Sequence, residues 1–231
     1  MRRPDEVVGL IVESDETVGT GGFLAVRRLR LRNQRADGSV SAPYTSDAIV
    51  RPYGQDAVAA VIYARASAGV DVLVREGIRP TVALIRDQSR APLPESTQGP
   101  FVTELVAGIL EENDRGEAGL RTRAAAEVLE EAGYVVNPAR VHILGAGAYP
   151  SAGALTEKLY FVAVEVDPTT QQALSGDGSP MEEDARTRWL SLDDAITACT
   201  RGDICDLKTE LGLRRLREWL TTAAEARARR A

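Results

Sequence analysis

Residues 108–134, GILEENDRGEAGLRTRAAAEVLEEAGY, hold the pattern from which the fold of the whole chain can be predicted. In the second half of this stretch an apolar residue recurs at every fourth position, at Leu120, Ala124, Val128 and Ala132. This period is typical of an amphipathic helix, and Gly133 follows it as a stop signal. The stretch predicts a helix over residues 119–132, preceded by a polar loop and by a strand that runs into Gly108.

Three glutamates of the predicted helix lie on one side of it. Glu127, Glu130 and Glu131 occupy positions i, i+3 and i+4, which places Glu130 and Glu131 each within about 60° of Glu127 around the helix axis. Carboxylates this close repel one another, and in the C-terminal half of a helix the helix dipole adds to the repulsion. Hard divalent cations such as Mg²⁺ take oxygen ligands. The spacing alone fits either a metal site or a solvated acidic face.

The order of the surrounding residues resembles a known motif, the Nudix box. The matching segments are ELVAG (residues 104–108), GE (residues 116–117) and AEVLEEAGY (residues 126–134). The resemblance implies a loop–helix–loop that holds carboxylates against magnesium ions, which neutralise a diphosphate and activate a water. Glu127 and Glu131 would be the principal metal ligands, Glu130 would assist, and the carbonyl group of Ala107 would complete a site. Glu130 and Glu131 are also the candidate catalytic residues. The implied cofactor is Mg²⁺, with Mn²⁺ as an alternative.

The box departs from the family pattern at the position before its first helix glutamate. The family has an arginine there, and this chain has Ala126. We hypothesise that Arg123, one turn earlier on the same face, substitutes for it through an i,i+4 ion pair with Glu127. The box is also longer than usual between Gly108 and Gly133.

The resemblance extends to segments outside the box. Three segments are similar to segments of ADP-ribose and UDP-sugar pyrophosphatases: residues 57–75 with IRP (residues 78–80), YPSAG followed by TE (residues 149–157), and GDICDLKT (residues 202–209). This branch implies Mg²⁺-dependent hydrolysis of a nucleoside diphosphate sugar to a nucleoside monophosphate and a sugar phosphate. ADP-ribose is the first expected substrate, and UDP-glucose and GDP-mannose are the alternatives.

The same branch implies further site residues. Arg79 is the candidate substrate-contacting cation, since a guanidinium group suits a phosphate or the face of a base; the alternative is a surface arginine at a strand end. Glu104 is a candidate for substrate or metal contact, or else a plain residue at the sheet edge. The loop at residues 178–184 matches a mobile loop with one more catalytic glutamate. Glu182 or Glu183 would be this general base or ligand, with Glu183 slightly favoured by alignment.

The expected fold is α/β: a Nudix α/β/α sandwich with a mixed sheet, preceded by an N-terminal β subdomain. Residues 6–90 are rich in short β-branched runs separated by turn signals, which predicts strands. We place the N-terminal β subdomain at residues 1–54 and the Nudix domain at residues 55–231. In this branch the N-terminal subdomain helps to form a homodimer and contributes substrate contacts.

The amino-acid composition of the chain argues against some classes of protein. The 231 residues include 34 acidic and 28 basic ones, for a net charge of −6, which argues against binding to a nucleic-acid backbone. No apolar run reaches the length of a membrane span, and no apolar segment follows the charged start, so we expect a cytoplasmic protein without membrane contact. Cys199 and Cys205 lack partners at zinc-ligand spacing and are expected to be buried thiols.

Two other classes remain open at this stage. One is a Nudix-fold binding or regulatory protein with weak or no hydrolysis, which Ala126 would favour. The other is an unrelated acidic α/β scaffold whose glutamate face is only solvated. The three helix carboxylates favour the enzyme.

Overall fold

The computed structural model describes residues 3–5, 7–67, 69–93, 99–174 and 178–228. These residues divide into two compact units. The first unit contains the chain up to Gln55 together with Tyr149–Lys158, and the second contains Asp56–Ala148 and the chain from Leu159 onward. The first unit is therefore built from two separate stretches of sequence.

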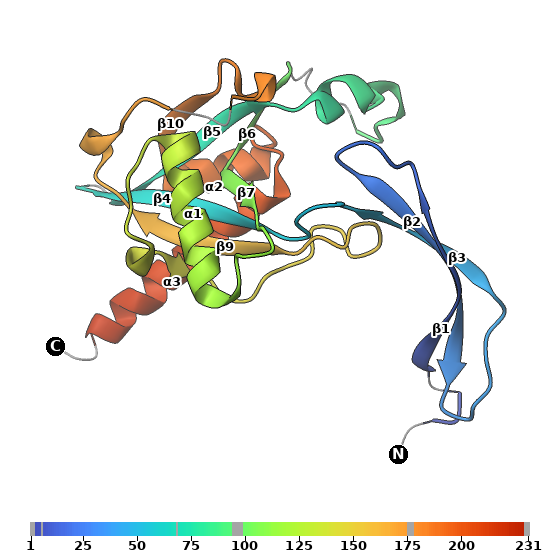
Figure 1. Ribbon diagram of the computed structural model, residues 1–231. Helices are drawn as coiled ribbons and strands as arrows, with labels where there is room; N and C mark the ends of the chain where they lie inside the picture. The colour runs from blue at the N-terminus through green and yellow to red at the C-terminus, as the bar shows by residue number, and fades with distance from the viewer. Residues whose placement is uncertain (1–2, 6, 68, 94–98, 175–177, 229–231) are drawn as a thin grey trace. The chain divides into compact units, whose positions relative to one another are not determined.

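The first unit is a three-stranded antiparallel sheet, drawn in blue in Figure 1. Its strands are β1 (Val7–Val18), β2 (Ala25–Arg35) and β3 (Tyr44–Val50), with β2 in the centre. The arginines that alternate along β2 pair with acidic residues of both neighbours: Arg28 lies 2.7 Å from Asp47 of β3, and Arg30 lies 2.8 Å from Glu13 of β1. The basic face of β2 is thus neutralised within its own sheet.

The segment Tyr149–Lys158 joins this unit through hydrogen bonds and one ion pair. The backbone N–H of Ile49 donates to the carbonyl oxygen of Ala154 over 2.7 Å. Arg51 lies 2.6 Å from Glu157, and both side chains are mostly buried. The last residues of β3 are therefore held by a part of the chain about 100 residues downstream.

The second unit contains a seven-stranded mixed sheet with the order β10-β5-β4-β9-β8, in which β6 also pairs with β5 and β7 with β4. Its strands are β4 (Ala57–Ala66), β5 (Gly69–Ile78), β6 (Phe101–Glu104), β7 (Val106–Ile109), β8 (His142–Ile143), β9 (Leu159–Glu165) and β10 (Arg186–Ser191). The central pair, β4 and β9, is parallel, and the other pairings are antiparallel. The sheet is therefore mixed, as predicted.

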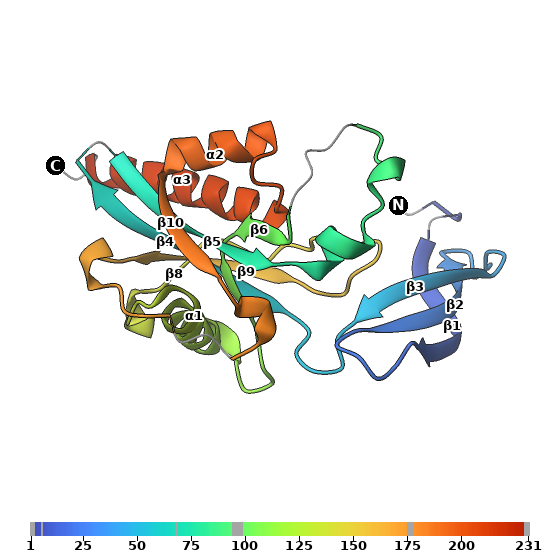
Figure 2. The same ribbon diagram turned by 90° about the horizontal axis from the view of Figure 1, so that it is seen from above.

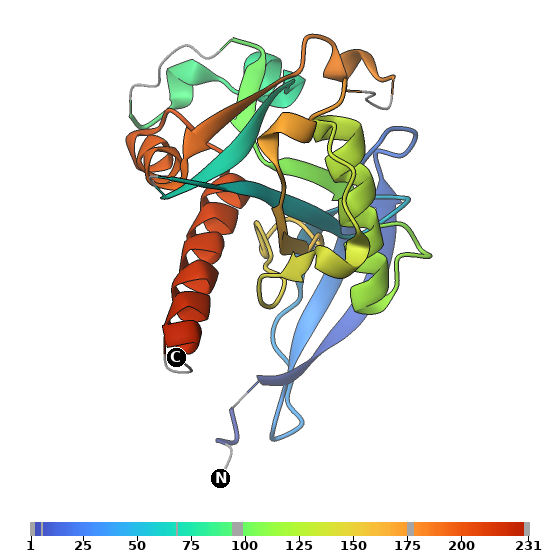
Figure 3. The same cartoon turned by 90° about the vertical axis from the view of Figure 1, so that its left-hand side faces the viewer.

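Helices cover both faces of this sheet (Figure 2). The helix α1 (Gly116–Ala132) packs on one face, and α2 (Leu192–Arg201) and α3 (Leu207–Ala228) pack on the other. Figure 3 shows α1 and α3 on opposite sides of the strands. The expected three-layer α/β/α arrangement is confirmed.

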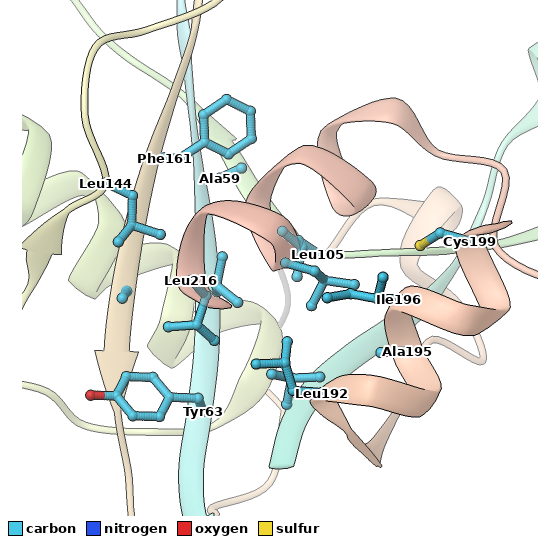
Figure 4. Packing of buried hydrophobic residues seen from close by; sticks show 14 of the residues in the cluster. Ala59, Tyr63, Leu105, Leu144, Phe161, Leu192, Ala195, Ile196, Cys199 and Leu216 are labelled. Carbon is cyan, nitrogen blue, oxygen red and sulfur yellow. The ribbon is translucent and has the colours of Figure 1, made fainter. Parts of the chain in front are cut away.

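The strand β4 has no solvent-facing side over most of its length, because alternate residues enter two separate cores. Ala59, Val61 and Tyr63 pack with α2 and α3 in one core, part of which Figure 4 shows. Val58 and Ile62 pack with α1 in the other core. Burial on both faces explains why the sequence of this strand is almost continuously apolar.

The ends of α1 follow from its sequence. It ends at Gly133, which adopts a left-handed conformation with φ 73°. The N–H of Gly133 donates to the carbonyl oxygen of Leu129, which is the single bond of the αL capping motif, and the N–H of Tyr134 donates to the carbonyl oxygen of Val128. A Cβ at Gly133 would lie 2.2 Å from the carbonyl oxygen of Gln172, so this position requires glycine for space as well as for conformation.

The segment FVTELVAGIL, expected as one strand, forms two strands. Its first part, β6, pairs with β5, and its second part, β7, pairs with β4. Between them Leu105 is buried, and its N–H donates to the hydroxyl oxygen of Thr209 at the start of α3 over 2.9 Å. The side-chain hydrogen bond replaces a strand partner at the point where the segment changes from one neighbour to the next.

Two smaller expectations have different outcomes. Neither Cys199 nor Cys205 forms a disulfide. Cys199 is buried, as predicted, whereas Cys205 is exposed and its thiol donates to the carbonyl oxygen of Gly202. None of the helices in the described part of the chain is long and apolar enough to cross a bilayer.

Candidate active site

Two of the three helix glutamates lie against β7. The buried face of α1 packs on the sheet, and Glu127 and Glu131, one turn apart, extend from the side of the helix that meets this strand. The backbone N–H of Ala107 donates to Oε2 of Glu131 over 3.2 Å. At Gly108 a Cβ would lie only 1.8 Å from Oε1 of Glu127. The absence of a side chain at Gly108 therefore creates the space that the Glu127 carboxylate fills.

The carboxyl group of Glu131 is the most perturbed acid of the site. Burial raises its pKa to about 7, and the negative charges of Glu127 and Glu182 act in the same direction. The Arg75 guanidinium group and the Ala107 N–H oppose this shift. A strongly shifted carboxyl group beside other carboxylates is typical of functional sites, and a bound cation would return it to its charged form.

Arg75 is the cation of this cluster, and sequence reasoning assigned it no role. It comes from β5 and is only 3% exposed. Its Nη1 atom lies 3.3 Å from Oε1 of Glu131, and its Nη2 atom lies 2.9 Å from Oε1 of Glu182. The signal that could have found it is the period of β5, since Arg75 alternates with the apolar residue Leu73 on the strand face that meets α1.

A cleft of about 430 Å³ opens at this cluster. Its lining includes all four glutamates that the sequence proposed as catalytic: Glu130, Glu131, Glu182 and Glu183. Two of these come from α1, and two come from the loop before β10, about 50 residues further along the chain. The structure therefore brings together residues that the sequence could only associate through a family resemblance.

The two loop glutamates differ in how far they are buried. Glu182 is partly buried and pairs with Arg75, whereas Glu183 is exposed. Glu182 ends a short 3-10 helix, η5 (Pro180–Glu182), at whose start the Ser179 hydroxyl accepts a hydrogen bond from the N–H of Met181, and Glu183 follows this helix. The geometry favours Glu182 over Glu183 as the residue that acts in the cleft.

Arg79 and Glu104, the proposed substrate-binding pair, contact each other. Glu104 is 3% exposed and forms ion pairs with Arg79 and with Lys208. Lys208 also lies 2.9 Å from Asp206. A buried carboxylate between two cations is best suited to hold them in place. In this arrangement Glu104 fixes Arg79, whose side chain is 40% exposed and is available to a ligand.

The Arg79–Glu104 pair lies next to the Arg75 cluster, because β5 and β6 are neighbouring strands of the sheet. Arg75 and Glu104 stand opposite each other in the register of β5 and β6. Gly77 leaves the space beside them open: a Cβ there would lie 3.0 Å from Nη1 of Arg75 and 3.5 Å from Oε1 of Glu104. Neither Arg79 nor Glu104 lines the cleft itself.

Arg123 contacts the partner that the sequence proposed for it and two more. Its Nη1 atom lies 3.9 Å from Oε1 of Glu127, one turn later on α1. Its other guanidinium nitrogens lie 2.9 Å from Asp114 and 2.7 Å from Glu111. Arg123 therefore connects the loop that precedes α1 with the glutamate that lies against Gly108, and the ion pair proposed between Arg123 and Glu127 is present.

The donor chemistry of the site fits a hard divalent cation. Glu127 and Glu131 offer carboxylate oxygens on neighbouring turns of one helix, with Glu130 beside them, and the carbonyl group of Ala107 belongs to the strand that they contact. Within the described residues, however, no three acidic, histidine or cysteine side chains already converge on one point. The place of a cation beside Glu131 is taken by the guanidinium group of Arg75.

Comparison with known proteins gives the following relatives. The ADP-ribose pyrophosphatase of Escherichia coli (strain K12) is 27% identical over 199 residues, which cover 86% of this chain and 82% of that protein. The GDP-mannose pyrophosphatase of Salmonella typhimurium is 28% identical over 143 residues, which cover 62% of this chain and 70% of that protein. No family model matches the chain.

Among solved structures, an ADP compounds hydrolase has a similar fold. The TM-score is 0.66 at 14% sequence identity, and the match covers 94% of this chain and 97% of the other. At this identity the likeness concerns the fold.

The sandwich and its glutamate-bearing loop–helix define a Nudix fold, and the expected fold class is confirmed. The resemblance to the ADP-ribose pyrophosphatase branch is confirmed as well, since the named relatives are nucleotide-sugar pyrophosphatases. The chain is thus similar to proteins named as ADP-ribose and GDP-mannose pyrophosphatases, and it has the fold of an ADP compounds hydrolase.

Proposed function

We propose that the protein hydrolyses the diphosphate of a nucleoside diphosphate sugar in a Mg²⁺-dependent reaction, giving a nucleoside monophosphate and a sugar phosphate. The observation that carries this proposal is the position of Glu127 and Glu131 against β7, where Glu131 lines a cleft that Glu182 lines from another part of the chain. ADP-ribose is the first substrate, because the ADP-ribose pyrophosphatase matches more of the chain than the GDP-mannose pyrophosphatase does. UDP-glucose and GDP-mannose are the alternatives.

Glu127 and Glu131 would hold the cation, with Glu130 and the carbonyl group of Ala107 as additional ligands. When bound, Mg²⁺, or Mn²⁺ in its place, neutralises the diphosphate and lowers the pKa of a coordinated water. The placement of the Glu127 carboxylate in the space at Gly108, one helical turn from Glu131, supports this ligand role.

Two residues of this chain would act on the substrate directly. Glu182 would accept a proton from the attacking water at its carboxylate, and its position at the cleft beside Arg75 supports this role. Arg79 would bind a phosphate or the face of the base with its planar guanidinium group. Glu104, held between Arg79 and Lys208, would keep that group oriented.

The first unit would serve dimerisation and contribute substrate contacts, as in the resembling branch. The apolar side chains that it exposes support this role: Val8, Leu10 and Val12 alternate along β1 and are each more than 40% exposed. A homodimer in solution, with no nucleic-acid or membrane partner and a cytoplasmic location, completes the proposal.

A substrate panel tests the activity. ADP-ribose, UDP-glucose and GDP-mannose are incubated with the protein and Mg²⁺, and the products are identified by ³¹P NMR. We expect a monophosphate and a sugar phosphate from at least one of them. Glu131→Gln should lower turnover by about a hundredfold or more, since it removes a metal ligand. Equal turnover by the variant would refute the ligand assignment. Binding of a nucleotide sugar without turnover would support the binding-protein alternative instead.

A further inference from the structure

Arg75 is a charged side chain in a place where charge is costly. It is 3% exposed, and a guanidinium group cannot lose its proton to avoid the cost of burial. Such a group is stable only beside compensating negative charges. The structure provides two, Glu131 and Glu182, at 3.3 Å and 2.9 Å.

The two carboxylates come from separate elements, and Arg75 forms an ion pair with each of them. Glu131 belongs to α1 and Glu182 to η5, while Arg75 comes from β5 beneath them. The Nε atom of Arg75 is buried and has no hydrogen-bond partner. The two ion pairs, and not a backbone contact at Nε, thus determine where the guanidinium group lies.

A cation that neutralised Glu131 would have to lie where the guanidinium group of Arg75 lies. No three ligand side chains converge among the described residues, and the Oε1 atom of Glu131 lies 3.3 Å from Nη1 of Arg75. A divalent ion bound to Glu131 would lie a few ångströms from the guanidinium group. At that distance like charges repel each other even in a medium of intermediate dielectric constant.

We propose that Arg75 is the internal counter-ion of the metal-free site: it neutralises Glu131, tethers Glu182 to the cleft, and competes with a divalent cation for Glu131. Arg75 is thus a positioning residue. The competition rests on the metal site of the proposed function, whereas the tether does not.

Two consequences follow. Removal of the charge at position 75 leaves Glu131 available, so a divalent cation binds more tightly. Removal of the charge also releases Glu182, so the segment around η5 opens more often in the metal-free protein. A residue with only a structural role would not produce the first consequence, because loss of packing weakens a ligand site.

The test compares Arg75→Met with the full-length wild type. Metal affinity is measured by titration with Mn²⁺ followed by electron paramagnetic resonance, which requires no turnover. We expect Arg75→Met to bind Mn²⁺ about tenfold more tightly, and Arg75→Lys, which keeps the charge, to resemble the wild type. Equal or weaker binding by a folded Arg75→Met would overturn the competition.

The tether has its own readout. In the metal-free protein we expect the backbone amides of residues 178–185 to exchange with deuterium about tenfold faster in Arg75→Met. Unchanged exchange would overturn the tether. Arg65→Met is the matched control, because Arg65 forms an exposed ion pair with Glu165 away from the cleft; it should alter neither readout.

Two further outcomes are separated by design. If Arg75→Met does not fold, the double variant Arg75→Met/Glu182→Gln is compared with Glu182→Gln. The double variant also removes one of the carboxylates that the loss of Arg75 leaves unpaired. If the double variant does not bind Mn²⁺ more tightly than Glu182→Gln, the competition is overturned. If the wild type binds no Mn²⁺, the competition fails together with the metal site of the proposed function, and amide exchange still decides the tether.

Discussion

The Glu127 carboxylate fills the space that a side chain at Gly108 would need: a Cβ there would be 1.8 Å from Oε1 of Glu127. Gly108 and Glu127 are 19 positions apart in sequence, yet one hydrogen atom in place of a methyl group leaves the space in which this carboxylate lies.

Gly108→Ala should therefore impair the site and spare the fold. The clash is with the end of a flexible side chain, and Gly108 has no left-handed φ, so the alanine can be accommodated by movement of Glu127. We expect turnover to fall about a hundredfold, as for a misplaced catalytic group. The melting temperature should change by only a few degrees. Gly99→Ala, where a Cβ meets nothing within 4 Å, is the control for turnover and melting. Unchanged turnover in Gly108→Ala would contradict a ligand role for Glu127.

Arg123→Ala should loosen the loop before α1 from the helix. The variant removes the contacts with Asp114, Glu111 and Glu127 together, and charge-assisted hydrogen bonds of partly buried groups contribute about 1–3 kcal/mol. We expect a lower free energy of unfolding in urea and about tenfold weaker Mn²⁺ binding. Arg123→Lys should restore only part of both, since lysine lacks the planar fork. If turnover and metal affinity stay at the wild-type level in Arg123→Ala, Arg123 does not replace the box arginine.

Glu182→Gln and Glu183→Gln distinguish the two loop candidates. Both side chains line the cleft, but Glu182 is partly buried and pairs with Arg75, whereas Glu183 is exposed. General-base catalysis contributes about 10²–10⁴-fold, so kcat of Glu182→Gln should fall by at least a hundredfold. The kcat of Glu183→Gln should stay within about threefold of the wild type. The opposite ranking at saturating substrate would show that Glu183 is the base, as the sequence slightly favoured.

The two thiols should differ in reactivity with pH. Burial raises the pKa of the Cys199 thiol to about 11, above its ordinary value of 9.0. Cys199 therefore stays protonated and unreactive at pH 8, and its stabilising contribution is present below pH 9 and lost as the pH rises through about 11. We expect a disulfide reagent to label one thiol per native chain at pH 8, the exposed Cys205, and the second after unfolding. Fast labelling of a folded Cys205→Ser variant would contradict this.

The sequence predicts the parts of the site that depend on local period. The fourfold spacing from Leu120 to Ala132 gives α1, and the i, i+3, i+4 spacing gives the glutamates on its surface. Both follow from the geometry of one helix, in which positions along the chain determine positions in space. The observed helix begins at Gly116, three residues earlier than predicted. The prediction missed these residues because they lack the apolar period on which it was based.

Features that depend on contacts between distant segments could not be predicted in the same way. The segment around Leu105 has the composition of one strand, and only the hydrogen bond to Thr209 shows why it becomes two. The direction of Glu182 depends on Arg75, which is 107 positions away in sequence. An arginine in an apolar strand indicates a buried charge, but its partners are set by the fold.

The first unit is not a detachable module, because Tyr149–Lys158 returns to it from the middle of the second unit. A chain shortened to begin at Asp56 would lose β1, β2 and β3 but would keep the segment that bonds to Ile49. The backbone groups of that segment would then lack their partners and be available for pairing with other molecules. Domain exchange or truncation in this protein therefore has to move both stretches together, and a minimal version of the enzyme cannot be made with a single cut.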